Sequence, residues 1–174
     1  QARKLIEDAI ALDPKFAAAY VFLGWTHFFD ARFGWAESPK KSITKAFDCA
    51  QKALQMDNTL DYAYTLLSAV YLVKRQFDKA ITEAKHALSL NPNGAHEHNT
   101  MAGVLGCSGK WEESILYGKK SLRLDPFPPP NSYHWLGRAY FMTGQYQDAI
   151  STFRKALRVN PNYLPAHAFL AASY

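Results

Sequence analysis

The amino-acid sequence predicts an all-α protein, a right-handed superhelical solenoid built from antiparallel helix pairs. The prediction depends on two sequence patterns that recur along the chain. The first places small and apolar residues before Asp-Pro or Asn-Pro, and it occurs as AIALDPKF, ALSLNPNG, SLRLDPFP and ALRVNPNY. The second lies upstream at matching distances, as YVFLGWTH, YTLLSAVY, HNTMAGVL and YHWLGRAY. Two patterns that recur together are the signature of stacked structural repeats that share one continuous core.

The spacing of these patterns divides residues 1–174 into a single array. The 61–94 and 130–163 units are each 34 residues long, whereas the first full unit is ten residues longer. The chain opens without a Met and in the middle of a helical pattern, so we expect a fragment of a longer protein. The expected parts are the end of a repeat at 1–16, full units at 17–60, 61–94, 95–129 and 130–163, and the start of a further repeat at 164–174.

Each unit is expected to bury an apolar stripe that it cannot cover alone. In the last full unit, Leu136 and Tyr140 recur at helical spacing on the first helix. Ala149 and Ala156 are small, so the second helix can approach the first closely. Pro161 then ends the second helix, because proline cannot continue the hydrogen-bond ladder.

Helix starts can also be predicted from capping residues. Asp78 and Asp148 precede the second helices of their units and are expected N-caps. In the long unit the first helix is expected to end near Asp30. Ser38 is the expected N-cap of the second helix, with Pro39 in its first turn. The second helix would then start about six residues early, and the loop before it would grow by about four.

These patterns resemble the tetratricopeptide repeat, whose signature is W-x2-L-G-x2-Y followed by Ala, Phe, Ala and Pro. The resemblance covers essentially the whole chain, and the 130–163 unit matches the signature at every spacing. The matching residues are Tyr133, Leu136, Gly137, Tyr140, Ala149, Phe153, Ala156 and Pro161. The resemblance implies a non-catalytic scaffold that binds a peptide or partner protein in a concave groove. The alternative is a structural or self-assembling spacer without a peptide ligand.

Two stretches carry a narrower resemblance. FDARFGWAESPKKSITKA and LDPFPPPNSYHWLGRAYFMTGQY look like parts of arrays that lie C-terminal to bacterial class III adenylate/guanylate cyclase domains and in related signalling proteins. This implies that the chain belongs to a larger bacterial signalling or regulatory protein.

The resemblance also implies where a partner would bind, because ligands of this family usually lie against fixed positions of the first helices. These positions are aromatic or apolar toward the N-terminus and polar toward the C-terminus. Arg138 could bind a carboxylate through directed hydrogen bonds. The aromatic residues could hold an apolar side chain, or Trp25 and Phe28 could only pack within the protein. The expected groove residues are Trp25, Phe28, Tyr62, His96, Asn99, Asn131, His134 and Arg138.

Phe33 and Trp35 lie in the enlarged loop of the 17–60 unit. They are expected either to pack over the edge of their own repeat or to serve as a docking element for a partner.

No catalytic arrangement is visible in the sequence, so we expect no enzyme activity, no catalytic residues and no cofactor. The spacing of His96 and His98 does not fit a metal site. The two isolated cysteines do not fit one either. GVLGCSGK differs from a phosphate-binding loop in glycine spacing and lacks the Ser/Thr that follows its Lys, so a turn glycine explains it. DPFPPPNS is either a rigid turn between repeats or a polyproline ligand.

Composition limits the partners further. No apolar run is long enough to span a bilayer, so no membrane partner is expected. Unpaired thiols suit a reducing compartment, and we therefore expect a cytoplasmic protein. Homo-oligomers could form through exposed ends of the array. The formal net charge is +5, and basic residues recur on the second helices as a solvated ridge or, alternatively, as a surface for an anionic partner such as nucleic acid. That ridge comprises Lys52, Lys85, Lys119, Lys120, Arg123, Arg154, Lys155 and Arg158.

Overall fold

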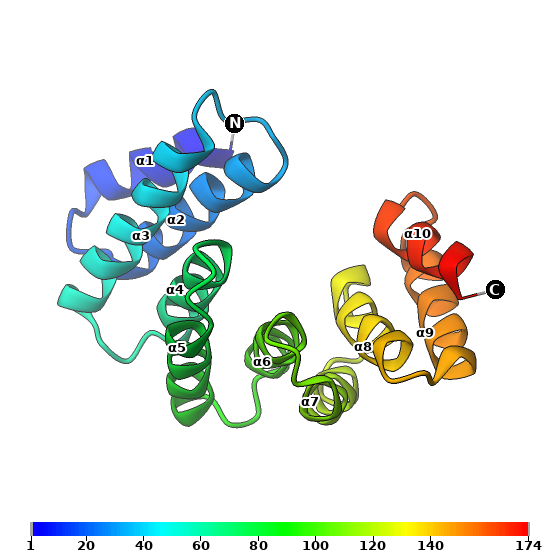
Figure 1. The fold of residues 1–174 in the computed structure, drawn as a ribbon. Helices are drawn as coiled ribbons and strands as arrows, with labels where there is room; N and C mark the ends of the chain where they lie inside the picture. The colour runs from blue at the N-terminus through cyan, green and yellow to red at the C-terminus, as the bar shows by residue number, and fades with distance from the viewer. Residues whose placement is uncertain (1, 174) are drawn as a thin grey trace. The chain divides into compact units, whose positions relative to one another are not determined.

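The computed structural model describes residues 2–173, which contain ten α-helices and no strand (Figure 1). The predicted all-α fold is therefore confirmed. The chain forms two compact units, 1–91 and 92–174, and each is described by itself. The terminal residues of the expected array, Gln1 and Tyr174, lie outside the described residues.

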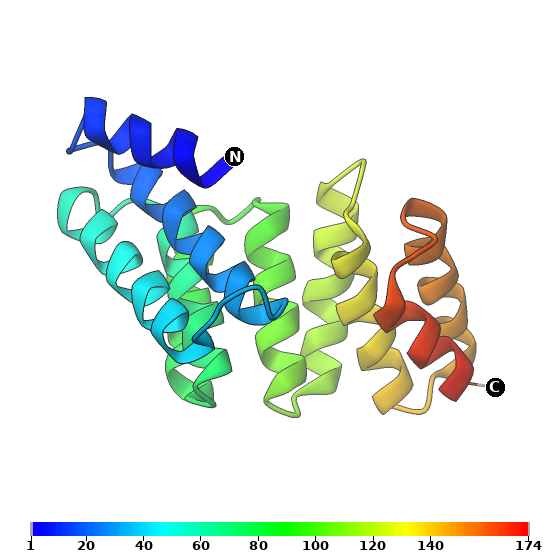
Figure 2. The same ribbon diagram turned by 90° about the horizontal axis from the view of Figure 1, so that it is seen from above.

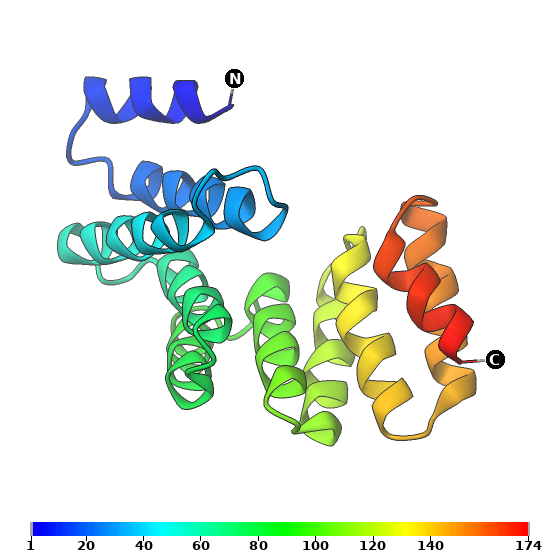
Figure 3. The same cartoon turned by 45° about the horizontal axis from the view of Figure 1, so that its top comes forward.

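The first unit holds two antiparallel helix pairs preceded by one helix (Figures 1 and 3). Helix α2 packs against α3 and α4 against α5, while α1 lies on α2 and α3 lies on α4. Fully buried alanines such as Ala46 and Ala50 let the helices of a pair approach closely, and Leu66 fills the space between pairs. The helices are α1 (Ala2–Leu12), α2 (Ala17–Arg32), α3 (Pro39–Met56), α4 (Asp61–Val73) and α5 (Phe77–Leu90).

The second unit repeats this arrangement, with pairs α6–α7 and α8–α9 side by side and α10 packed on α8 and α9 (Figure 2). Phe153 is fully buried at its centre, where its ring stacks on Phe169 at 5.4 Å between centroids. The helices are α6 (Ala95–Cys107), α7 (Trp111–Leu124), α8 (Pro130–Met142), α9 (Tyr146–Val159) and α10 (Leu164–Ala172).

Five helices begin at the first residues of the expected repeats, namely Ala17, Asp61, Ala95, Pro130 and Leu164. This agreement follows from the Pro and Asn signals that end the preceding helices. The grouping of the repeats into one array stays a prediction.

The expected N-caps Asp78 and Asp148 were wrong, by two and three residues respectively. Gln76 and Gln145 are the N-cap residues, so both carboxylates lie inside the first helical turn. There the positive end of the helix dipole stabilises their negative charge. The shift follows from the turn, since Gly144 has a φ of 75° and the next backbone N–H, of Gln145, donates to Tyr140 O at 2.9 Å. The second helix starts immediately after this left-handed turn.

The long unit distributes its ten extra residues over three places. Helix α2 has 16 residues against 13 in α4, and α3 has 18 against 14 in α5, so four lengthen α3, three lengthen α2 and three lengthen the connection. Ser38 is the N-cap of α3, as predicted, and accepts a hydrogen bond from the backbone N–H of Lys41. The expected end of α2 near Asp30 was early, because the turn at Gly34 (φ 74°) lets the helix continue to Arg32.

Candidate functional site

An aromatic row runs along α2 of the first unit and into the connection after it. We define the aromatic row as Trp25, Phe29, Phe33 and Trp35. Trp25 stacks on Phe29 at 5.5 Å between ring centroids, Phe29 stacks on Phe33 at 5.9 Å, and Phe33 meets Trp35 at 5.1 Å. The row therefore links a predicted groove residue with both residues of the predicted docking loop.

Three members of this row are exposed to solvent. Phe29 is 42% exposed, Phe33 57% and Trp35 73%. Trp35 contacts Phe33, which rests on Phe29, yet most of its surface is exposed, so packing over the edge of the repeat and docking of a partner both stay predictions. Phe28 differs from the row because it is 6% exposed and belongs to the core with Ile43. Its expected place in a partner groove is not available to a ligand in this structure.

Backbone hydrogen bonds hold the connection in a defined conformation. The N–H groups of Trp35 and Ala36 both donate to Asp30 O, at 2.9 and 3.1 Å. The side chain of Asp30 pairs with Arg3 of α1, and Arg3 Nε also donates to Thr26 Oγ1. Tyr62, another predicted groove residue of this unit, lies in the first turn of α4 and is 41% exposed.

In the second unit, Arg138 of α8 is the most distinctive of the predicted residues. Its guanidinium carbon lies 5.4 Å from the ring centroid of Trp111 and 5.9 Å from that of Trp135. Arg138 Nη1 donates to Cys107 Sγ at 3.7 Å. No carboxylate within residues 2–173 lies at ion-pairing distance from this half-buried guanidinium.

The tryptophans beside Arg138 lie over glycines of α6. A Cβ at Gly103 would come within 2.9 Å of the Trp135 ring, and one at Gly106 within 3.2 Å of the Trp111 ring. These glycines make room for the indole rings that contact Arg138. The repeat pattern did not predict Trp111, Trp135 and Cys107 as neighbours of Arg138, although the glycine-rich end of α6 indicated space for large side chains.

Other predicted groove residues are less accessible. His134 is 9% exposed, and its ring contacts Trp135, Tyr163 and Phe169 at 5.1 to 6.0 Å between centroids. Asn99 of α6 is 6% exposed. His134 and Asn99 were expected in the groove, but helix packing covers both in this structure.

His96 is half-buried on α6, and Asn131 is exposed in the first turn of α8. Of the polar groove residues in this unit, Arg138 and Asn131 are those on α8 that keep access to solvent.

Two histidines that are not among the predicted groove residues have a lowered pKa. Burial is the main cause of the lowered pKa of His98, whose Nε2–H donates to Pro92 O at 3.0 Å. Burial also lowers the pKa of His27, with a further contribution from the positive charges of Arg3 and Lys45. Both groups therefore favour the neutral form in the folded protein.

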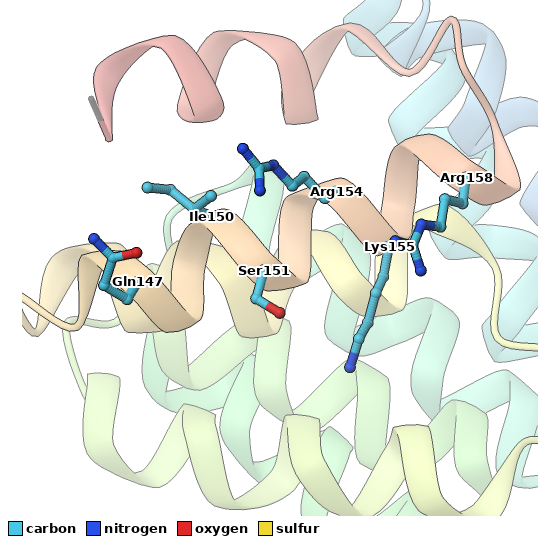
Figure 4. A pocket seen from close by; sticks show the side chains of 6 residues that line it. All are labelled: Gln147, Ile150, Ser151, Arg154, Lys155 and Arg158. Carbon is cyan, nitrogen blue, oxygen red and sulfur yellow. The ribbon is translucent and has the colours of Figure 1, made fainter.

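Three residues of the basic ridge, Arg154, Lys155 and Arg158, line one pocket on α9. Figure 4 shows a shallow pocket on α9 in which Arg154 and Lys155 point in different directions. Elsewhere on the ridge, Lys52 lies 4.4 Å from the ring centroid of Tyr20. These contacts fit a solvated ridge. The remaining pocket residues are Gln147, Ile150 and Ser151.

Within residues 2–173, no group of three or more His, Cys, Asp and Glu side chains could hold a metal ion. None of the helices described is long and apolar enough to cross a membrane.

Family models described as tetratricopeptide repeat match residues 62–93 and 130–163. Superkiller protein 3 of Schizosaccharomyces pombe is 25% identical over 171 residues, which is 94% of this chain and 12% of that protein. Small glutamine-rich tetratricopeptide repeat-containing protein 2 of Mycosarcoma maydis is 29% identical over 99 residues, covering 57% of this chain and 28% of that protein. The chain thus spans only a minor part of the length of these relatives.

Solved structures share the fold. A thermophilic TPR protein of Thermus thermophilus matches 99% of this chain and 88% of its own, with a TM-score of 0.78 at 21% identity. A chain of the APC/C hetero-tetramer Cut9–Hcn1 matches with a TM-score of 0.84 at 18% identity, over 99% of this chain and 32% of that one. YrrB, described as a TPR protein with an unusual peptide-binding site, matches 97% of this chain and 81% of its own, with a TM-score of 0.62 at 18% identity. The solved structures support the all-α fold, and the family matches show that residues 62–93 and 130–163 of this chain are tetratricopeptide repeats.

Proposed function

We propose that this chain is a non-catalytic docking module for a partner protein or peptide, and that Arg138 binds a carboxylate of that partner. The observation that carries the proposal is the environment of Arg138, whose guanidinium contacts two indole rings and has no carboxylate at ion-pairing distance within residues 2–173. Proteins with tetratricopeptide repeats generally act as protein-interaction scaffolds, and the peptide-binding site named for YrrB supports a peptide as the ligand by analogy.

The contacts of Arg138 prepare it for this task. A free arginine side chain has about 2 kcal/mol of rotamer entropy, much of which is lost when it binds a ligand. Here the rings of Trp111 and Trp135 and the Cys107 sulfur already restrict the side chain. A carboxylate that meets the planar fork of N–H donors gains charge-assisted hydrogen bonds, which contribute about 1.5–3 kcal/mol each. Asn131, exposed on the same helix, is the proposed second polar contact.

The proposal can be tested by selecting random peptides with free C-termini against the purified chain. Selected peptides are expected to bind Arg138→Gln at least tenfold more weakly, equivalent to about 1.4 kcal/mol, by fluorescence anisotropy. Arg123→Gln is the matched control, because Arg123 is an exposed arginine on α7 of the same unit. Amidated peptides identify whether the terminal carboxylate is the group bound. Equal binding to wild type and Arg138→Gln contradicts the proposal, as does a selection that enriches no peptide.

Self-association is a second candidate function, because apolar side chains of the first and last helices are exposed. Leu5 and Leu12 of α1 are 67% and 89% exposed, and Leu164 of α10 is 77% exposed. Light scattering across a concentration series should show an oligomer that Leu12→Glu reduces. A monomer at every concentration contradicts this candidate.

The larger protein to which this chain would belong, and its location in the cell, are also proposals. An attachment to a bacterial signalling protein of the class III cyclase type, and a cytoplasmic location, stay predictions from the sequence. Binding of nucleic acid by the basic ridge is disfavoured by the divergent side chains of α9.

A further inference from the structure

We propose that the aromatic row of the first unit is a second docking surface, and that its occupant is a partner segment with an apolar anchor flanked by Asp or Glu. This surface is separate from the one proposed around Arg138, and it does not depend on that proposal. The row ends in the connection at the end of the α2–α3 pair (Figure 3).

The first step is the exposure of the row. Phe29, Phe33 and Trp35 are 42%, 57% and 73% exposed, and Phe22, one helical turn before Trp25, is 52% exposed. Scattered exposed apolar residues are ordinary, but rings in mutual contact form a continuous apolar surface. Aromatic side chains of this kind are the usual anchors of protein interfaces.

The second step is the fixed geometry of the exposed rings. The backbone N–H of Phe33 donates to Phe29 O at 2.9 Å, and those of Trp35 and Ala36 converge on Asp30 O. Ser38 caps the next helix, so the connection is bounded by hydrogen bonds on both sides. The two exposed rings are thus presented by an ordered backbone, and a partner need not order the connection when it binds.

The third step is that the two rings contribute little to the core. Neither Phe33 nor Trp35 belongs to a buried cluster of the first unit, whose centre is formed by residues such as Phe28 and Leu66. The turn itself is held by main-chain hydrogen bonds and by Gly34, so it does not require either ring. Their exposure is explained by contact with another molecule better than by stability.

Charge around the connection indicates the chemistry of the occupant. Arg32 precedes the turn, and Lys40 and Lys41 follow Ser38 in the first turn of α3, all three exposed. Glu37 is the one exposed carboxylate between Arg32 and Lys41. The surface therefore combines an apolar centre with a positive surround, which complements acidic residues on both sides of an apolar anchor.

Single-stranded nucleic acid also combines negative charge with rings, but the ring geometry disfavours it. Trp25 and Phe29 are within 26° of parallel, and Phe29 and Phe33 within 19°, so these rings cover one another's faces. Bases bind by stacking on open ring faces. Trp35 is the most exposed of these rings, and aliphatic or aromatic side chains of a protein partner can pack against it.

The test uses the Arg138→Gln chain, so that binding through the first proposed site is disabled. Random peptides selected against it are expected to share an apolar or aromatic residue flanked by Asp or Glu. Phe33→Ala/Trp35→Ala in the same background should weaken their binding at least tenfold. Phe127→Ala is the matched control, because Phe127 is an 88% exposed aromatic residue in the connection before α8, in the second unit. It should leave binding unchanged.

Circular dichroism should show the same melting temperature for the double variant and its parent. If the double variant melts lower, Trp35→Ala alone carries the same binding test, since Trp35 is the most exposed of the row. Reversing charge with Lys40→Glu/Lys41→Glu should also weaken the selected peptides. The proposal is overturned if the selection enriches no peptide, if enriched peptides lack acidic residues, or if Phe33→Ala/Trp35→Ala binds them equally. Binding of oligo(dT) that is lost in that variant would assign the surface to nucleic acid instead.

Discussion

Gly137 in the middle of α8 offers a sharp test of the packing in the second unit. A Cβ at this position would lie 2.8, 2.9 and 3.0 Å from Cε1, Cζ and Cδ1 of Phe153. Phe153 is fully buried, and its ring stacks on Phe169 within 17° of parallel. The ring therefore has no free space into which it could move, and Gly137→Ala must displace one helix from the other.

Two opposing effects set the size of the change in stability. Alanine favours a helix interior over glycine by about 1 kcal/mol. Overpacking a well-packed core costs about 1–3 kcal/mol. We expect the steric effect to dominate, because three ring atoms are involved, and Gly137→Ala should be destabilised by about 1–2 kcal/mol. In a chain of this size, that lowers the melting temperature by about 2–8 °C.

Thermal unfolding followed by circular dichroism measures the effect, and a double-mutant cycle identifies its cause. Phe153→Leu removes the ring atoms that clash, so the double variant should be more stable than the sum of the single changes by about 1 kcal/mol. Gly118→Ala is a matched control, because an added Cβ there would lie no closer than 3.2 Å to its nearest neighbour, Leu136. A Gly137→Ala variant that melts at or above wild type would refute this reasoning, and so would a cycle without coupling.

Further changes test other features of the fold. The lowered pKa of His98 means that the unfolded chain takes up a proton first as the pH falls below about 6.5, so stability is lost over that range. His98→Gln should therefore reduce the fall in melting temperature between about pH 7.5 and pH 5.5, and an unchanged fall would contradict the assignment. Ser114 Oγ donates to Ala102 O at 2.7 Å in a fully buried position, so Ser114→Ala should lose about 1 kcal/mol in urea unfolding. Gly144 has a φ of 75° with no atom within 4 Å of an added Cβ, so Gly144→Ala should lose about 1 kcal/mol through backbone strain alone. Urea unfolding of Gly109→Ala should show the same loss, because its φ is 80°, and clearly unequal losses would argue against a purely conformational cost.

Helix starts were predictable because they depend on local chemistry. Pro39 and Ser38 specify the start of α3 by capping and by the fixed φ of proline, whatever packs against that helix. Asp78 and Asp148 were misassigned because acidic residues are favourable both at an N-cap and in the first turn. Only the turn geometry, with its left-handed residue before Gln76 or Gln145, distinguishes these two positions.

The candidate sites were less predictable, because exposure depends on neighbouring helices. The family pattern placed Phe28 and His134 in a groove, but α3 and α10 supply the residues that bury them. Arg138 was predicted from its charge, whereas its contacts with Trp111 and Trp135 require the tertiary packing of α6, α7 and α8. The exposure of Trp35 likewise could not be read from the sequence, since the same residue could have folded back onto its helix.

Glu37 lies between two hydrogen-bonded signals that operate independently. The turn at Gly34 ends α2 by its own hydrogen bonds, and Ser38 starts α3 by its own. The length of the chain at Glu37 is therefore free to vary without changing the register of either helix. This makes the segment a natural point for inserting a reporter peptide or a protease site, and a cleaved chain would keep both helices of the pair on their existing contacts.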